Sequence, residues 1–343
     1  MKSLETMRTK VAVAILNWNG RSMLERYLPS VVRYSEADWC KVFVIDNAST
    51  DDSVDYLNSH FPTVGLVRLD KNYGFAGGYD IGLRSIEADY YVLLNSDVRV
   101  TPGWIDAVIS YMDSHADVAV CQPKILSERD NSLFEYAGAC GGYIDRYGYP
   151  FCRGRVFSTV EKDKGQYDDV ASVFWASGAA FFIRSDVFHS VGGFDETFFA
   201  HMEEIDLCWR IKRAGYGICC IPSSVVYHVG GATLGAENPY KTYLNFRNNL
   251  LMMRKNLAVR GYGRVMLARA FLDCLSVLLF TFKFDFKKAR AVIKARVDYA
   301  KCKKHYQRSC GNESFAECYG GSGGMKYYLS GCKTFEKLRS KWR

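Results

Sequence analysis

From residue 11 to residue 94 the chain alternates short, continuously apolar runs with segments whose apolar residues recur at helical spacing. The runs span residues 11–16, 41–45, 64–69 and 90–94, and each is followed by polar residues. Helical spacing is clearest over 21–34, where the apolar positions are Leu24, Tyr27, Leu28, Val31 and Val32. Strands that are apolar at every position are typical of a sheet covered on both faces, and repeated strand–helix units favour parallel pairing. The sequence therefore predicts an α/β fold with a doubly wound, Rossmann-like sheet.

After residue 100 the pattern becomes mixed, with a loop-rich Gly/Tyr stretch at 136–155. The remaining expected elements are a helix ending near residue 59, a glycine-rich turn and helix over 71–82, a strand at 178–184, helices at 186–191 and 203–214, and a last strand at 225–228. From Pro239 onward the pattern is helical. We expect a catalytic domain over residues 1–238 and a helical region over 239–343.

The C-terminal part of the chain is basic. The net charge is +8, yet residues 283–343 alone carry 16 Lys and Arg against 5 Asp and Glu. Because no nucleic-acid-binding motif accompanies this charge, it favours anionic lipid over nucleic acid as the partner. The most apolar segment, 266–282, is short for a membrane span and is interrupted by Arg269 and Asp273. It predicts a helix that lies in the membrane surface. The alternative is a helix packed on the catalytic domain beside a solvated basic segment.

The cysteines do not form a disulfide pattern. All 12 are scattered, the only adjacent pair is Cys219-Cys220, and no C-x-x-C motif occurs. This predicts reduced thiols in a cytosolic protein, several of them in the core. Residues 1–10 are polar and the run 11–16 is too short for the apolar core of a signal peptide, so none is expected.

Short polar clusters stand where predicted strands end or helices begin. They are Asp46 to Asp51, Asn95-Ser96-Asp97, Glu203-Glu204-Ile205-Asp206 and His228 before a glycine pair. Hard divalent cations prefer carboxylate oxygens and are often shared with substrate phosphates, and Mn²⁺ also accepts imidazole. Carboxylates and one imidazole at strand ends therefore indicate an enzyme that binds a metal ion and a nucleotide diphosphate.

Each cluster also has a structural interpretation. Asp46 can accept from a nucleobase or ribose while Ser49 or Thr50 caps the next helix. Asp97 can bind a metal or cap a helix starting near Thr101. Glycines at 74–78 permit a ligand to approach the backbone, although no Walker motif is present.

The acidic cluster and His228 are equally open. Glu203, Asp206 and Arg210 share one helical face, and acids in a first turn are favoured by the helix dipole. Three carboxylates are more than the helix dipole requires at a first turn, so one of them can serve as a base. His228 can be a ligand or a structural residue.

Taken together, these residues resemble the inverting family-2 glycosyltransferases with the GT-A fold, particularly the rhamnosyltransferase-like branch. The matching stretches occur in the family's order between residues 10 and 255. They are Leu16-Asn-Trp-Asn-Gly20, Val44-Ile-Asp-Asn-Ala-Ser-Thr-Asp51, Asn72-Tyr-Gly-Phe-Ala-Gly-Gly78, Leu93-Leu-Asn-Ser-Asp97, Trp175-Ala-Ser-Gly-Ala179, Gly192-Gly-Phe-Asp-Glu196, Glu203-Glu-Ile-Asp-Leu-Cys208 and His228-Val-Gly-Gly231.

The resemblance implies a single continuous mixed sheet with a nucleotide-binding half and an acceptor half. It implies a metal site (Mn²⁺ or Mg²⁺) at Asp97 and His228, and Glu204 as the base, with Glu203 and Asp206 beside it. The implied donor-binding residues are Leu16, Asn17, Asp46, Asn72, Gly74, Gly78, Asn95 and Ser96. The implied acceptor-side residues are Trp175, Ser177 and Gly178.

The implied reaction moves a sugar from a dTDP-, UDP- or GDP-sugar to a hydroxyl of a lipid-linked saccharide, with inversion, in surface polysaccharide or glycan synthesis. The implied location is the inner face of the cytoplasmic membrane. Alternatives are a nucleotidyltransferase and a non-catalytic nucleotide-sugar-binding scaffold.

Three positions depart from the family's pattern. Asn95 replaces the first acid of the D-x-D element, Glu203-Glu204 replaces the usual Glu-Asp pair, and Asp80 stands where Asn is usual. The second departure leaves open which glutamate is the base.

Overall fold

The computed structural model describes residues 9–230, 238–258, 261–306 and 315–342. The matched Gly231 lies outside these residues. The larger of two sheets has nine strands, in the order β11-β13-β6-β12-β4-β1-β2-β3, with β5 paired to β13. Its strands are β1 (Val11–Asn17), β2 (Cys40–Asp46), β3 (Gly65–Arg68), β4 (Tyr90–Asn95), β5 (Val98–Val100), β6 (Val118–Ser127), β11 (Ala171–Ser172), β12 (Ala180–Arg184) and β13 (Gly217–His228).

Strand pairing brings the ends of many strands to one edge. β1 pairs in parallel with β2 and β4, β2 pairs in parallel with β3, and β13 pairs in parallel with β6. β12 is antiparallel to both β4 and β6, so the carboxyl ends of β4 and β6 and the amino end of β12 meet. The sheet is therefore mixed and continuous, as the resemblance implied, and its carboxyl edge collects the predicted site residues.

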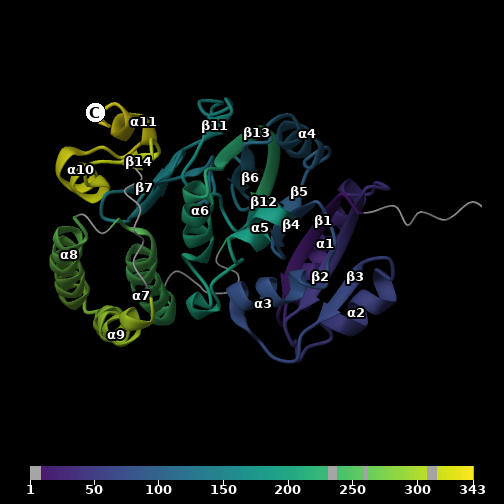
Figure 1. Ribbon diagram of the computed structural model, residues 1–343, viewed down its shortest axis with the longest axis horizontal. Helices are drawn as coiled ribbons and strands as arrows, with labels where there is room; N and C mark the ends of the chain where they lie inside the picture. Colours follow the sequence, from purple (N-terminus) through teal and green to yellow (C-terminus); the bar gives the residue numbers. More distant parts are fainter. Residues whose placement is uncertain (1–8, 231–237, 259–260, 307–314, 343) are drawn as a thin grey trace, which may run out of the picture.

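Helices cover both faces of this sheet (Figure 1). Along β1, Val11, Val13 and Ile15 belong to one buried cluster, while Ala12 and Ala14 belong to the other. This alternation explains why the strand is apolar throughout. The helices flanking the sheet are α1 (Arg21–Tyr34), α2 (Ser53–His60), α3 (Gly74–Leu83), α4 (Asp106–Ser114), α5 (Ser185–Ser190) and α6 (Glu203–Arg213).

A smaller, five-stranded sheet lies where loops were expected. Its order is β10-β9-β8-β7-β14. The strands are β7 (Gly142–Asp145), β8 (Pro150–Cys152), β9 (Arg155–Val156), β10 (Thr159–Val160) and β14 (Cys318–Tyr319). The expectation of loops at 136–155 was thus wrong for part of that stretch. Strands of two to four residues carry too little periodicity to be recognised in sequence.

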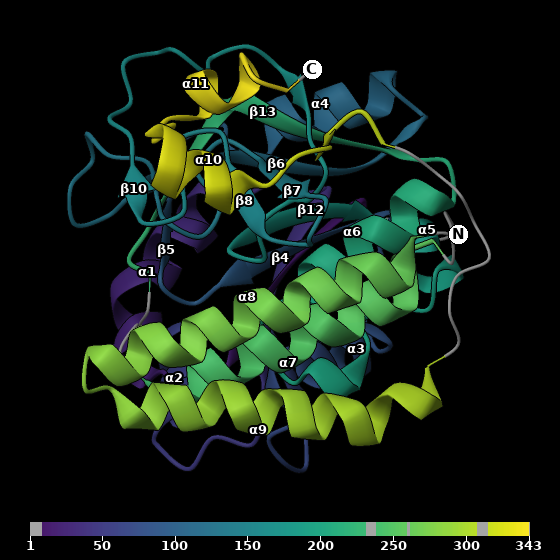
Figure 2. The same ribbon diagram turned by 90° about the vertical axis from the view of Figure 1, so that its left-hand side faces the viewer.

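The C-terminal region is mostly helical, but it is not helical throughout. It contains α7 (Pro239–Asn256), α8 (Tyr262–Phe282), α9 (Phe286–Cys302), α10 (Gly323–Ser330) and α11 (Phe335–Arg339), and its strand β14 pairs in parallel with β7. Figure 2 shows α8 and α9 lying side by side across one face of the molecule. Helix α8 is long and apolar enough to cross a membrane by length and composition, and most of its surface is exposed.

The glycine-rich turn and helix expected over 71–82 correspond to the turn before helix α3 and to α3 itself, which begins at Gly74. One smaller expectation needs correction. The last strand of the sheet begins at Gly217 rather than near residue 225. The cysteines of the described residues are free thiols, as expected.

Candidate active site

The ends of β1 and β2 hold a pair of polar side chains. Asn17 donates from Nδ2 to Oδ1 of Asp46 over 3.2 Å, and the N–H of Ser49 donates to Oδ2 of Asp46 over 3.1 Å. Both Asn17 and Asp46 are buried, and Oδ1 of Asn17 has no partner among the described residues. Helix α2 begins at Ser53 without a side-chain cap, so the expected capping by Ser49 or Thr50 is wrong. Ser49 instead organises the Asn17–Asp46 pair.

The glycine-rich segment does not present free backbone N–H groups at the start of α3. The N–H groups of Phe75 and Ala76 donate to the carbonyl of Phe199 over 2.7 and 3.2 Å. A Cβ on Gly74 would lie 2.5 Å from the Phe199 ring, and Gly74 has a φ of +73°. A glycine is needed at position 74 because Phe199 packs directly against the start of helix α3.

Other predicted donor-side residues support this helix start. Asn72 accepts through Oδ1 from Nδ2 of Asn47 over 3.0 Å. A Cβ on Gly78 would meet the Leu16 side chain at 2.7 Å. These glycines therefore allow close packing, which is the simplest reason for their presence.

Asp97 and His228 come together where β4 turns into β5. Because β5 pairs with the end of β13, Val98 lies opposite His228. Oδ1 of Asp97 is 3.1 Å from Nε2 of His228, and Nδ2 of Asn95 is 3.3 Å from the same nitrogen. Helix α4 begins only at Asp106 and has no side-chain cap, so Asp97 does not cap it. The prediction that Asp97 and His228 share a site agrees with this geometry, while Ser96 lies beside the turn at Gly20.

Glu135 is a member of this cluster that the sequence did not reveal. Its Oε1 lies 3.5 Å from Nδ1 of His228, on the other side of the ring from Asp97. Burial opposes a charge on His228, but the hydrogen bonds to Asp97 and Glu135 outweigh it and raise the pKa of His228 to about 10. Glu135 reaches this place because its N–H donates to the carbonyl of Ile125 on β6. A lone acid in a Gly/Tyr-rich stretch carries no signal of such a contact.

Asp97 and His228 have a spacing that suits neighbouring ligands of a hard cation. Octahedral ligands at about 2.0–2.1 Å from an ion are about 3 Å apart, which is close to the observed 3.1 Å. Within the described residues, no three His, Cys, Asp or Glu side chains converge on one metal position. Glu135 faces the opposite ring nitrogen. The two side chains would therefore supply two ligands to such an ion, with Nε2 of His228 giving up the proton that it shares with Asp97.

Glu203 and Glu204 open helix α6 immediately after a strained turn. Phe199, His201 and Met202 all have positive φ values, of 62°, 70° and 73°, a conformation that non-glycine residues seldom adopt. Oε2 of each glutamate is buried and has no partner among the described residues. Burial raises the pKa of Glu204 to about 7, and burial together with the Glu204 charge raises that of Glu203 well above its usual range. Glu204 is partly exposed and Glu203 is buried, so Glu204 is the more accessible of the two.

Asp206 is committed to holding the helix in place. It is fully buried and accepts from Nε of Arg210 over 2.9 Å, from Nζ of Lys255 over 2.8 Å and from Nδ2 of Asn256 over 2.7 Å. Its carboxylate therefore ties α6 to α7. This geometry supports a structural role for Asp206 in place of the predicted catalytic one.

The predicted acceptor-side residues are buried or tightly packed. The Trp175 indole is in the core, stacked on Gly142, and donates to the carbonyl of Tyr143 over 2.9 Å. The N–H of Ser177 donates to Oε1 of Gln122 over 2.9 Å. Gly178 lies at the carboxyl edge beside Phe75, where an added Cβ would be 3.2 Å from the ring. The predicted contact of Trp175 with an acceptor does not agree with its burial, since its indole has no exposed face to offer.

Electrostatic effects connect the cluster of Asp97, His228 and Glu135 to Glu204. The Cys152 thiol lies close enough to Glu135 and Glu204 for both carboxylates to act on its pKa, although burial is the main cause that raises it to about 11. Lys241 of α7 is similarly close to both Glu135 and His201. Asp97, His228 and Glu135 therefore form one cluster at the carboxyl edge of the sheet, and Glu204 lies near enough to Cys152 to act on its pKa together with Glu135.

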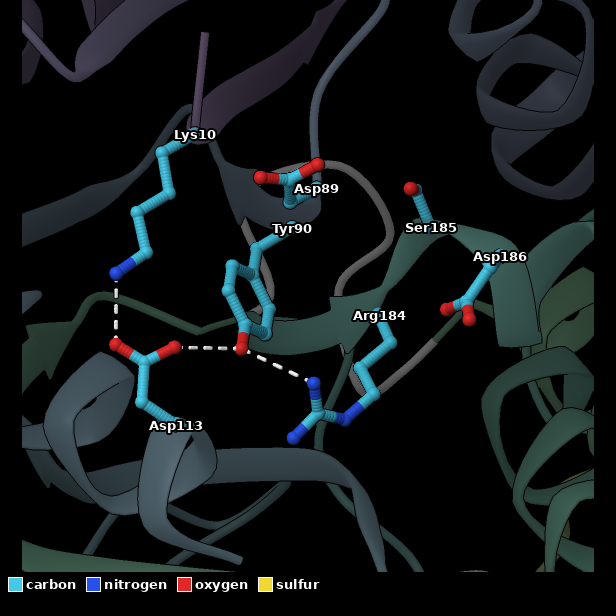
Figure 3. Close-up of a pocket in the computed structure, with 7 residues that line it drawn as sticks. All are labelled: Lys10, Asp89, Tyr90, Asp113, Arg184, Ser185 and Asp186. Atoms are coloured by element: carbon cyan, nitrogen blue, oxygen red, sulfur yellow. Dashed lines mark hydrogen bonds and ion pairs between the residues drawn. The ribbon is translucent and has the colours of Figure 1, made fainter. Parts of the chain in front are cut away.

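A hollow of about 330 Å³ lies at the opposite edge (Figure 3). Its charged groups bond to one another: Lys10 to Asp113 over 2.7 Å, Tyr90 to Asp113 over 2.8 Å, and Arg184 to the Tyr90 hydroxyl over 3.0 Å. These groups stabilise the start of β1 and β4. These four side chains therefore bond to one another.

The unusual Asp80 also has a structural explanation. It pairs with Arg84 one turn along α3 over 2.6 Å, and its Oδ1 occupies the space that a Cβ on Gly193 would need. The position thus joins α3 to the turn after α5.

Comparison with known proteins identifies the family of the chain. Residues 12–184 match the family described as Glycosyl transferase family 2. The chain is 27% identical over 247 residues to the N-acetylglucosaminyl-diphospho-decaprenol L-rhamnosyltransferase of Mycobacterium tuberculosis (strain ATCC 25618 / H37Rv), covering 67% of this chain and 80% of the relative. It is 27% identical over 231 residues to the dTDP-rhamnosyl transferase RfbF of Shigella flexneri, covering 63% and 72%.

The fold is also found in solved structures. The crystal structure of GalNAc-T7 with UDP, GalNAc and Mn²⁺ superposes with a TM-score of 0.58 at 14% identity, over 88% of this chain and 57% of that one. The chain therefore spans little more than half of that protein, and the likeness concerns the fold alone. With the GT-A fold and a family match over half its length, the chain is a glycosyltransferase and belongs to glycosyl transferase family 2.

Proposed function

We propose that this enzyme transfers a sugar from a nucleotide-diphosphate donor to a hydroxyl of a lipid-linked saccharide, with inversion at the anomeric carbon. The observation that carries the proposal is the pairing of two features at one sheet edge. One is the Asp97–His228 pair, with the spacing of metal ligands. The other is Glu204, a partly exposed acid whose burial raises its pKa to about 7.

In this proposal the protein groups divide the work between donor and acceptor. Asn17 and Asp46 lie at the ends of β1 and β2, where nucleotides bind in open α/β sheets. Asp97 and His228 would hold a divalent cation, which neutralises charge on the leaving diphosphate when bound. Glu204 accepts the proton of the acceptor hydroxyl as the acceptor oxygen attacks the anomeric carbon, and Glu203, whose pKa is raised by burial and by the Glu204 charge, lies beside it. Because the acceptor oxygen displaces the nucleoside diphosphate in a single step, the configuration at the anomeric carbon is inverted.

The substrate class follows from the relatives and from the sequence. Two relatives are named for rhamnosyl transfer, and one of those names carries a diphospho-decaprenol acceptor. We propose the same class here: a deoxysugar or hexose donor and a lipid-linked acceptor at the cytoplasmic face of the membrane. A nucleotidyltransferase would attack phosphorus and would have no use for a base placed like Glu204.

The exposed side of α8 and α9 supports membrane contact. Large apolar side chains of α8 point to solvent, with Phe282 78% exposed. Two of its three charged residues point inward: Arg269 and Asp273 are buried, and Asp273 pairs with Arg296 of α9. The third, Arg264, is exposed in the first turn of the helix, and further basic residues follow on α9. A helix with its apolar side outward and its central charges inward against the protein suits the interface plane better than a span.

The transfer is tested by incubating the enzyme with Mn²⁺ or Mg²⁺ and a panel of nucleotide sugars, and measuring release of the nucleoside diphosphate. We expect release from one donor, abolished by EDTA and by Asp97→Ala. The stereochemistry of the product, read by NMR, tests inversion. Release that is unchanged by both treatments would contradict the metal assignment.

Membrane contact is tested by sedimentation with vesicles that contain anionic lipid. The triple variant with Phe271, Leu278 and Phe282 changed to Ser removes apolar area from α8 and should lose binding. The matched control is Leu329→Ser on α10, which is 77% exposed. Equal binding by the triple variant and the control would contradict the proposal. Substitutions are preferable to deletion, because β14 pairs with β7 and deleting the tail would disturb the small sheet.

A further inference from the structure

The turn that precedes the two glutamates is held by one side chain of the C-terminal region. Nδ2 of Asn248, on helix α7, lies 2.8 Å from each of three carbonyl oxygens, those of Phe198, Ala200 and His201. Asn248 is completely buried. An amide has two N–H donors, so at least one of them is shared between two carbonyls. Three carbonyls turned toward one point form a site that only a donor can occupy.

The orientation of this amide is fixed by its neighbour. Nε of Arg247 donates to Oδ1 of Asn248 over 2.8 Å, and Nη2 of Arg247 donates to the carbonyl of Thr197 over 2.7 Å. The amide oxygen therefore faces a cation and the amide nitrogen faces the carbonyls. A flipped amide would place its oxygen against three acceptors.

The turn is contacted from the opposite side by α3. The carbonyl of Phe199, the one that Asn248 does not reach, accepts from the N–H groups of Phe75 and Ala76. Segment 198–201 thus has all four carbonyls bonded, three to α7 and one to α3. Such complete bonding is what keeps Phe199, His201 and Met202 at positive φ.

The shape of the turn sets where α6 begins. The carbonyl of Met202 accepts from the N–H of Asp206 in the first turn of α6, which starts at Glu203. A change in the turn rotates or frays this first turn and moves the Glu204 carboxylate. We propose that Asn248 is a positioning residue for sugar transfer, which holds turn 198–202 in the shape that directs Glu204 toward the acceptor. This inference rests on the proposed role of Glu204 as the base.

The test compares Asn248→Ala and Asn248→Ser with Asn245→Ala. Asn245 lies on the same helix, and within the described part of the chain its side chain bonds only to the carbonyl of Lys241, one turn back. A misplacement of about 1 Å can cost about 10²-fold in rate, so we expect kcat to fall roughly 10- to 100-fold in Asn248→Ala. Asn248→Ser keeps one donor and should fall less. Donor affinity, measured by calorimetry, should stay within about threefold for each variant, since the fall in rate comes from misplacement.

A double-mutant cycle separates positioning from general damage. In a Glu204→Gln background, Asn248→Ala should cost little more, because both changes remove the same function. The pH dependence of kcat/KM in Asn248→Ala should also move away from that of the wild type, since burial sets the pKa of Glu204. Asn245→Ala should change neither quantity.

The outcomes are distinct. Folded Asn248 variants with wild-type kcat and pH profile overturn this inference and leave the proposed function standing. An additive loss in the double mutant, or a parallel loss of donor affinity and thermal stability, overturns it as well, since Asn248 would then be purely structural. If Glu204→Gln itself turns over like the wild type, the proposed base fails and this inference fails with it.

Discussion

Nε2 of His228 lies 3.1 Å from Oδ1 of Asp97, although 131 residues separate them in the chain. The contact exists because the three-residue strand β5, directly after Asp97, pairs with the last three residues of β13. The other ring nitrogen, Nδ1, faces Glu135 at 3.5 Å. A carboxylate behind a metal-binding histidine fixes the ring's orientation and its tautomer. In the proposed metal site, Asp97 and Glu135 would therefore have different tasks on the two sides of one imidazole.

Glu135→Gln should weaken Mn²⁺ binding about 10- to 100-fold, the usual effect of losing a carboxylate that orients a metal-binding histidine. The measurement is Mn²⁺ titration followed by electron paramagnetic resonance, which reports free ion and needs no substrate. Glu128→Gln is the matched control. The Glu128 carboxylate accepts from Arg99, and only its backbone N–H contacts His228, by donating to the His228 carbonyl. Equal loss in both variants would indicate a general charge effect and would contradict the orienting role of Glu135.

Glu204→Gln should lower the rate about 10²- to 10⁴-fold, the contribution of a general base. In the wild type, kcat/KM should fall as the pH drops below about 7, because burial raises the pKa of Glu204 to about 7 and only the deprotonated acid accepts a proton. The measurement is kcat/KM from pH 5 to pH 9, where a slope of one on the acid side is expected. A flat profile in the wild type would exclude Glu204 as the titrating base.

The sequence could predict β1 to β4, β12 and part of β13, because apolar runs alternate with helical segments there; the buried strand β6 and the short strands β5 and β11 were missed. The strand-end residues Asp46, Asp97 and His228 could be named for the same reason. The small sheet could not, since β9, β10 and β14 have two residues each and are defined only by their partners. Nor could the role of Trp175 be read from its motif, because burial against Gly142 depends on how the two sheets meet.

Glu135 and Asn248 were missed for a related physical reason. Each acts on groups that are remote in sequence, a ring nitrogen in one case and backbone carbonyls in the other. Carbonyls carry no sequence signal at all. The strain at Phe199 and Met202 was equally invisible, because neither residue is of a type that favours positive φ.

Glu203→Gln should change the pH dependence of stability. Burial and the Glu204 charge raise the pKa of Glu203 in the folded state. Such a group contributes stability that is fully present below the unfolded pKa, about 4.3, and is lost as pH rises through the folded pKa. Because Gln cannot ionise, the Tm of the variant relative to the wild type should increase from pH 5 to pH 9. Glu87→Gln, at an exposed position, should give a constant difference. Parallel curves for Glu203→Gln and wild type would contradict a raised pKa.

Gly74→Ala should destabilise the fold and disturb the turn before α6. A residue other than glycine at a φ of +73° costs roughly 1–2 kcal/mol. The added Cβ would also stand 2.5 Å from the Phe199 ring and 2.6 Å from its carbonyl oxygen, and such overpacking costs about 1–3 kcal/mol more. The measurement is the free energy of unfolding in urea.

Gly192→Ala separates the two contributions to this loss. Gly192 has a φ of +84° with no atom near the added Cβ, so its replacement should show the backbone cost alone, about 1–2 kcal/mol. The excess at Gly74 then measures the contact with Phe199. If both variants lose the same stability, the turn at Phe199 moves away from an added Cβ on α3 without cost. The contact with α3 would then not hold the turn rigidly enough to position Glu204.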